Sequence, residues 1–236
     1  MRVRKQTSLA LNITLIPTVL ATCLGSLGQD WNPQTRNAGQ FPTVVFNCSR
    51  SDADPPYYSI AVDSTGNATY QAIPNSVART GAPYTVEFLA SSTTRAQIFA
   101  MIASLHFLRV LGTDPALNVA SSSHTLIFTE GRQRNEIQYD TASDPNVQNL
   151  TTLFERISST LEFGRRLGTM EQSAPAEIEA ELRRMENMIH AKQLVELQVL
   201  SPVLQQIASD SKVSPISRQQ AQLILNGIAS PQPGSR

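Results

Sequence analysis

The chain has 236 residues and a mass of 25.8 kDa, and its 19 basic side chains balance 19 acidic ones. Because a nucleic-acid-binding surface needs a surplus of Lys and Arg to meet the phosphates, this balance argues against a nucleic-acid partner. With 41% apolar and 16% charged residues, the composition is that of a globular protein. It excludes a wholly disordered chain and a protein with several membrane spans.

Residues 1–28 have the pattern of a secretory signal peptide. Three basic residues lie within the first five positions, an apolar stretch follows over residues 9–24, and small residues lead up to Gly28. The stretch contains Pro17 and is shorter than the roughly 20 apolar residues of a membrane span. We therefore expect an exported protein, periplasmic or secreted, with no transmembrane span in the mature chain. Residues 29–42 are predicted to be a linker.

The two cysteines, Cys23 and Cys48, are affected differently by this processing. The sequence Leu-Ala-Thr-Cys that ends at Cys23 resembles a bacterial lipobox, in which the cysteine receives lipid. The alternative to a free exported protein is therefore a chain that is lipid-anchored through Cys23. Otherwise cleavage removes Cys23, and Cys48, at the end of an apolar run, is predicted to be a buried structural cysteine.

Residues 43–167 are predicted to form an α+β body. Alternating apolar and polar residues indicate a half-buried antiparallel sheet, with turn residues at 63–67 and 130–132 closing two hairpins. We place the first strand at an edge of the sheet. The predicted strands are residues 43–48, 57–63, 68–73, 84–90, 125–129 and 135–140.

Two helices are predicted to cover one face of this sheet. A capping box of Thr94 and Gln97 begins the first, which we extend to Gly112. Asp144, followed by proline, begins the second, and Gly164 is predicted to end it. The second helix has an apolar face made of Val147, Leu150, Phe154, Ile157 and Leu161. The expected fold is an α+β two-layer sandwich of two hairpin-helix units; whether these are a true duplication stays open.

Residues 168–230 are predicted to be helical, and residues 231–236 to be a disordered tail. We expect one helix, opened by Pro175 and Glu177 and running to Leu200, that is broken near Pro202, and a last helix from Pro215 that completes a helical hairpin. The apolar residues of this region are more numerous than one face of a helix can hold: Met185, Met188, Leu194, Val195, Leu197, Val199 and Leu200. They are covered either by the protein itself or by a second copy or protein partner.

The sequence contains no motif for a catalytic, cofactor or metal site, and none is predicted. Its three histidines, His106, His124 and His190, lie far apart and form no metal-binding pair. We interpret His106 as a structural residue of the first helix and His190 as solvated. The tyrosines all fall in predicted strands, where core positions are favoured over a binding platform.

Residues 58–70, followed by a helix with Ile98, Phe99 and Phe107, resemble a small domain of unknown function found in exported bacterial proteins. The resemblance covers about a third of the chain and carries no functional residues, since none are established for that family. Residues 194–228 are similar to a single HEAT-like helical pair, whereas a solenoid needs about three repeats.

These observations favour an exported, non-enzymatic binding protein, associated with the cell envelope or with a protein partner. The alternative is a small secreted hydrolase whose site is assembled from distant residues, such as His106 or His124 with a serine and an aspartate. A histidine within hydrogen-bond reach of both a Ser or Cys and a carboxylate would favour the enzyme.

Overall fold

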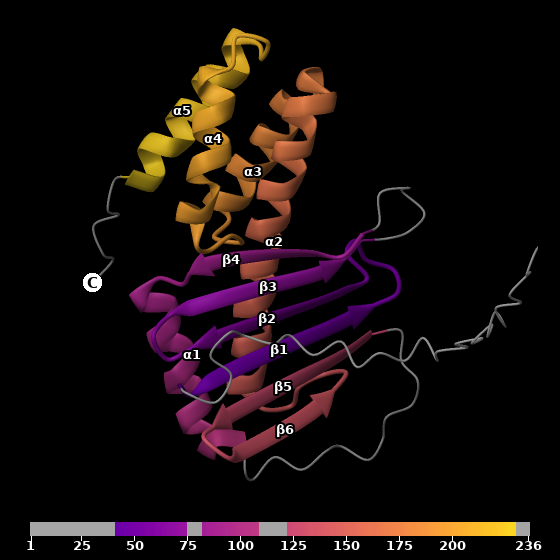
Figure 1. Cartoon of the computed structure of the whole chain (residues 1–236), viewed down its shortest axis with the longest axis vertical. Helices are drawn as coiled ribbons and strands as arrows, with labels where there is room; N and C mark the ends of the chain where they lie inside the picture. Colours follow the sequence, from indigo (N-terminus) through magenta and orange to yellow (C-terminus); the bar gives the residue numbers. More distant parts are fainter. Residues whose placement is uncertain (1–40, 75–81, 109–121, 230–236) are drawn as a thin grey trace, which may run out of the picture. The chain divides into compact units, whose positions relative to one another are not determined.

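The structure is a computed structural model that describes residues 41–74, 82–108 and 122–229 (Figure 1). These residues form one six-stranded antiparallel sheet in the order β4-β3-β2-β1-β5-β6, together with five α-helices. The predicted α+β class is confirmed. The strands are β1 Thr43–Arg50, β2 Tyr57–Asp63, β3 Asn67–Ile73, β4 Tyr84–Leu89, β5 Ser122–Glu130 and β6 Gln133–Tyr139.

β1 lies in the middle of the sheet, so its predicted place at an edge is wrong. Phe46 lies opposite Ile60 on β2 and opposite Leu126 on β5. Each of the two hairpins leaves one free edge, and β1 supplies hydrogen-bond partners to both edges. Its buried apolar side chains, such as Phe46 and Cys48, are at most 1% exposed, as a central strand requires.

The predicted turn between β2 and β3 is confirmed in detail. The Asp63 Oδ1 atom accepts the backbone N–H groups of Thr65 at 2.8 Å and of Asn67 at 3.0 Å. Gly66 follows with φ of 100°, a conformation that residues with a Cβ rarely adopt. The sequence in this turn therefore fixes the register of the hairpin.

α1 spans Ser92–Ser104 and begins earlier than the capping box predicted. Its N-cap is Ser91, whose Oγ atom accepts the Thr94 N–H at 3.2 Å, so Thr94 lies inside the helix. The helix ends at Ser104 instead of extending to Gly112, which lies outside the described residues. The three residues from His106 to Leu108 have positive φ, which no α-helix allows.

α2 spans Pro145–Ser173 and begins as predicted. The Asp144 carboxylate caps it by accepting the Asn146 N–H at 2.7 Å. The predicted end at Gly164 is wrong, because the helix continues for nine more residues. A Cβ at Gly164 would lie 3.3 Å from the Leu200 side chain, so this glycine permits close packing. The predicted boundary at residue 167 consequently falls inside α2.

The C-terminal region is helical, and its final helical pair is confirmed. A 3₁₀ turn, Pro175–Glu177, leads to α3 Ile178–His190, and a second 3₁₀ turn, Leu197–Leu200, leads to α4 Ser201–Ser209 and α5 Pro215–Ala229. The predicted continuous helix from Glu177 to Leu200 is wrong, since α3 ends at His190. Lys192 and Glu196 both have positive φ. Pro202 is the second residue of α4, in the first turn, where a missing N–H costs nothing, and it breaks no helix.

The buried apolar residues form two clusters. The first lies between the sheet and the pair α1 and α2, which cover the same face (Figure 1). The second joins the C-terminal half of α2 to α3, α4 and α5. Of the seven surplus apolar residues predicted from the sequence, Met185, Leu194 and Leu200 are at most 6% exposed, and the other four are half-buried against the two clusters. The chain itself therefore covers most of that surface.

The segment between α3 and α4 is tied to both clusters. The Glu196 carboxylate, 5% exposed, accepts the Ser91 N–H at 2.8 Å and the Ser91 hydroxyl at 2.7 Å. The Thr160 hydroxyl on α2 donates to the Val195 carbonyl at 2.7 Å. These bonds fix the segment against the start of α1 and the middle of α2.

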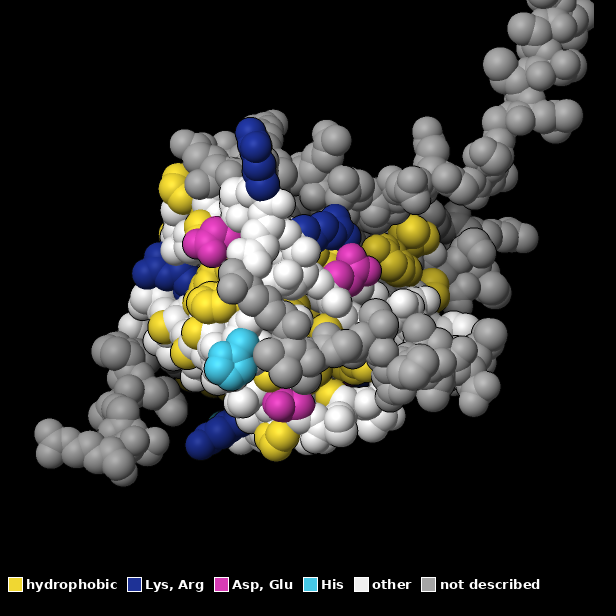
Figure 2. All heavy atoms as spheres, turned by 90° about the horizontal axis from the view of Figure 1, so that it is seen from below, with side chains coloured by type: hydrophobic (Ala, Val, Ile, Leu, Met, Phe, Trp, Pro, Cys, Tyr) yellow, Lys and Arg dark blue, Asp and Glu magenta, His cyan; other side chains and the backbone are white. Residues whose placement is uncertain are grey.

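Charges of both signs are mixed on the face shown in Figure 2, where Lys and Arg side chains are scattered between acidic ones. Within the described residues, no helix is both long and apolar enough to cross a membrane.

Candidate functional site

A row of aromatic rings crosses the face of the sheet that α2 covers, with one ring from each strand. The centroid distances are 5.4 Å for Tyr139–His124, 5.7 Å for His124–Phe46, 6.0 Å for Phe46–Tyr58, 5.9 Å for Tyr58–Tyr70 and 6.0 Å for Tyr70–Tyr84. Aromatic pairs at such distances attract one another. The predicted core position of the tyrosines is confirmed for Tyr58, Tyr70 and Tyr139, which are buried.

α2 presents a polar edge to the hydroxyl groups of this row. The Tyr139 and Thr151 hydroxyls lie 2.6 Å apart, and Thr151 itself donates to the Val147 carbonyl, so Tyr139 is the donor in this pair. Ser158, two turns further along α2, lies 3.3 Å from the Tyr70 hydroxyl. The hydroxyls of Tyr139 and Tyr70 thus have hydrogen-bond partners on α2.

Glu162 ends this polar edge and is only 4% exposed. Its Oε1 atom accepts hydrogen bonds from the Tyr70 hydroxyl at 2.8 Å and from the Tyr84 hydroxyl, and its Oε2 atom accepts the Arg165 Nε–H at 2.8 Å. Burial, with the neighbouring Glu162 charge, raises the pKa of Tyr70 well above its usual value, so this phenol stays protonated and donates. The carboxylate is therefore fully engaged by internal partners.

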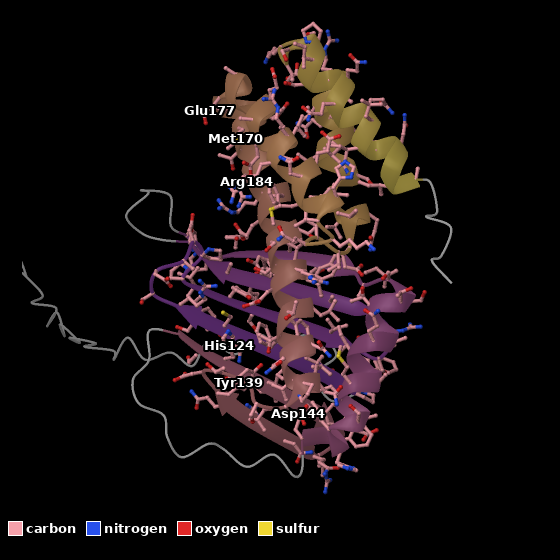
Figure 3. The ribbon with its side chains drawn as sticks, turned by 180° about the vertical axis from the view of Figure 1, so that it is seen from behind. His124, Tyr139, Asp144, Met170, Glu177 and Arg184 are labelled. Carbon is pink, nitrogen blue, oxygen red and sulfur yellow. The ribbon has the colours of Figure 1, made fainter. Side chains whose placement is uncertain are left out.

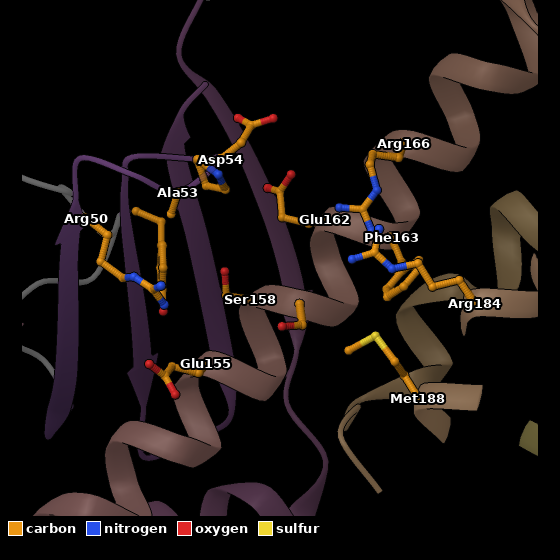
Figure 4. Close-up of a pocket in the computed structure, with 13 residues that line it drawn as sticks. Arg50, Ala53, Asp54, Glu155, Ser158, Glu162, Phe163, Arg166, Arg184 and Met188 are labelled. Atoms are coloured by element: carbon orange, nitrogen blue, oxygen red, sulfur yellow. The ribbon is translucent and has the colours of Figure 1, made fainter. Parts of the chain in front are cut away.

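Beside Glu162, a pocket of about 330 Å³ opens between the segment after β1, α2 and α3 (Figure 4). This volume is at the lower end of the range for small-molecule sites. Charged and polar side chains dominate its wall: Arg50, Asp54, Glu155, Ser159, Arg166 and Arg184. Pro55, Phe163 and Met188 supply apolar surface.

The charged side chains of the pocket differ in whether they have an ion-pair partner. Arg166 donates through Nε to Glu181 at 2.6 Å, and both groups are largely buried. Arg184 and Glu155 form no ion pair with any residue in the described part of the chain. The pocket therefore presents one cation and one anion that a ligand could engage without breaking an internal ion pair.

The three histidines lie outside this pocket. His124, 8% exposed, stacks within the aromatic row beside Tyr139 (Figure 3), and neither of its ring nitrogens has a hydrogen-bond partner in the described residues. His106 is exposed just beyond the end of α1, so its predicted place in that helix is wrong. His190 is exposed, as predicted, and lies 4.0 Å from a Glu186 oxygen.

The geometry required for the hydrolase alternative is not formed by the described residues. None of these histidines donates to or accepts from a serine, a cysteine or a carboxylate at hydrogen-bond distance there. The described residues likewise contain no group of three or more His, Cys, Asp or Glu that could hold a metal ion.

Cys48 is buried, as predicted, whereas Cys23 lies outside the described residues. Burial raises the pKa of the Cys48 thiol, and a hydrogen bond with Tyr58 opposes this effect. A raised pKa keeps the sulfur protonated at neutral pH, where a thiol is a weak nucleophile. This environment agrees with a structural cysteine.

The pocket is not among the predicted sites, although one of its signals is visible in the sequence. Ser158 and Glu162 are four residues apart and lie beside Ile157 and Leu161 on the apolar side of α2. A carboxylate at such a position requires buried donors, because an isolated buried charge is very costly. The tyrosines of β3 and β4 supply these donors.

Comparison of the chain with protein-family models and with curated proteins found no match. The resemblance of residues 58–70 to a domain of exported bacterial proteins stays a prediction.

Proposed function

We propose that this chain is exported and acts outside the cytoplasm as a non-enzymatic binding protein, whose pocket between α2 and α3 takes a small polar ligand. The observation that supports this most is the pocket of about 330 Å³ with Arg184 and Glu155 unpaired among the described residues. Charged groups at a concave surface fix the orientation of a ligand and supply specificity.

Filling the pocket should abolish ligand binding. Ser159 is half-buried in the pocket wall on α2, and we expect Ser159→Trp to occupy the space without disturbing the buried face of the helix. A screen of small polar compounds by thermal denaturation should find ligands that raise the melting temperature of the parent protein. Saturation at a hundred times Kd stabilises by about 2.7 kcal/mol. Ser159→Trp should lose this response, and Thr152→Trp, at an exposed position of the same helix outside the pocket, should keep it. Equal responses in the parent and Ser159→Trp would place the ligand elsewhere.

Export is proposed from residues 1–28, which lie outside the described residues. We expect the mature chain to begin between Cys23 and Asp30, because a signal peptidase cuts after small residues. N-terminal sequencing of the protein from the culture medium or periplasm measures this directly. A chain that begins with Met1 or Arg2 would refute export by this signal. Incorporation of a labelled fatty acid that disappears in Cys23→Ala would favour the lipid-anchored form.

We also propose that the chain binds a second copy of itself through α5, the last of its C-terminal helices. Ile216 and Leu223, seven residues apart and so on one side of α5, are 63% and 60% exposed. We expect Ile216→Ser with Leu223→Ser to reduce the oligomeric mass measured by light scattering, because both lose apolar contact area. Gln222→Ser, exposed on another side of α5, should leave the mass unchanged. A monomeric parent protein would end this proposal.

A further inference from the structure

Two guanidinium groups lie over one aromatic ring in the wall of the pocket. The Cζ atom of Arg166 is 4.5 Å and that of Arg184 is 5.8 Å from the centroid of Phe163. Figure 4 shows both guanidinium groups beside this ring, where the two side chains approach each other from α2 and α3. Phe163 is only 1% exposed, so the ring is a fixed support for both cations.

Only one of these two positive charges has an internal partner in the described residues. Glu181 accepts from the Nε atom of Arg166, which leaves the two terminal nitrogens of that guanidinium outside this bond. The cation–π contacts with Phe163 are electrostatic and need no N–H donor from either guanidinium. Two neighbouring cations with available N–H groups form an oxyanion site, because a carboxylate or phosphate accepts two parallel hydrogen bonds from arginine.

The part of the pocket nearer the start of α2 holds charges of both signs, Glu155 and Arg50 (Figure 4). Glu155 is half-buried, lines the pocket and forms no ion pair with any other described residue, and Ser159 lies one turn further along the same helix. A simple anion would be repelled by Glu155. Hydroxyl groups would instead donate to this carboxylate and exchange hydrogen bonds with the serine.

The apolar part of the wall suits a ligand with a saturated ring. Pro55 and Met188 also line the pocket. Such surfaces pack against the C–H groups of a ring, while the hydroxyls at its edge reach polar partners.

We infer that the ligand of this pocket is an acidic sugar, a small hydroxylated ring with one anionic group. The anionic group, a carboxylate or a phosphate, lies between Arg166 and Arg184, and ring hydroxyls bond to Glu155 and Ser159. This inference rests on the proposed function and specifies the class of its ligand.

Calorimetric titration of the mature chain with glucuronate, glucose 6-phosphate and glucose tests the inference. At least one of the two acids should bind at least tenfold more tightly than glucose. The acid that binds more tightly shows whether the pocket prefers a carboxylate or a phosphate. Arg184→Gln, at an exposed position where folding should be retained, should weaken the acid at least tenfold and leave glucose unchanged. Arg183→Gln is the matched control, since Arg183 is the neighbouring exposed arginine on α3 and pairs with Glu179 outside the pocket.

Three results would overturn the inference. These results are that glucose binds as tightly as the acids, that Arg184→Gln leaves the affinity for the acids unaltered, and that neither acid binds. If glucose equals the acids and Ser159→Trp abolishes its binding, the anionic subsite is wrong while the proposed small-ligand pocket stands. If compounds bind and Ser159→Trp has no effect on any of them, the pocket itself is wrong.

Discussion

Replacing Phe154 by alanine is expected to lower the free energy of unfolding by about 3 to 5 kcal/mol. Phe154 has no exposed surface, and its ring stacks on Phe46 of β1 with a centroid distance of 5.0 Å and an interplanar angle of 4°. β1 is the central strand, so the cavity would open in the middle of the contact between α2 and the sheet. The surrounding rings are held by their own neighbours and would refill it only in part.

Urea denaturation followed by circular dichroism measures this loss. Thr152→Ala provides the control, because Thr152 is exposed on the same helix and its replacement should change stability by less than about 0.5 kcal/mol. A loss below about 0.5 kcal/mol for Phe154→Ala would show that α2 does not cover the core. The slope of the urea dependence should be unchanged, since the same surface is exposed on unfolding.

The features of the fold that can be predicted from the sequence are those that depend on residues close together along the chain. The hairpin turn at Asp63 and the N-cap at Asp144 were correctly predicted because each depends on residues within four positions along the chain. Gly164 was misread as a helix end because its role depends on Leu200, which is distant in sequence. The central position of β1 likewise depends on pairing with two strands, one of which lies almost eighty residues further along.

The position of the pocket cannot be predicted from the sequence for the same reason. Its walls come from three segments, represented by Arg50, Glu155 and Arg184, and nothing in their spacing indicates that they meet. The end of α3 at His190 matters most here. A helix that continued to Leu200, as predicted, would not return the chain to α2 at Val195. That return joins the two apolar clusters, which fixes α3 beside the pocket.

Replacing Glu162 by alanine is expected to cost about 3 kcal/mol of unfolding free energy, because removal of one partner from a buried ionic network leaves the others unsatisfied. The Tyr84 hydroxyl and the Arg165 Nε would lose this acceptor, and the Tyr70 hydroxyl would keep only its contact with Ser158. Tyr70 has no exposed surface, so water cannot easily replace the carboxylate at its hydroxyl.

Glu162→Gln separates the charge from the hydrogen bonds. The amide oxygen can still accept from both tyrosines, while the attraction of Arg165 is lost, so its cost should be roughly half that of Glu162→Ala. A double-mutant cycle of Glu162→Ala with Tyr70→Phe should give a coupling energy of about 1 kcal/mol, measured by urea denaturation. If the two losses add without coupling, or if Glu162→Ala costs less than about 1 kcal/mol, this carboxylate does not hold α2 to β3 and β4. In that case the wall of the pocket beside it would rest on apolar packing alone.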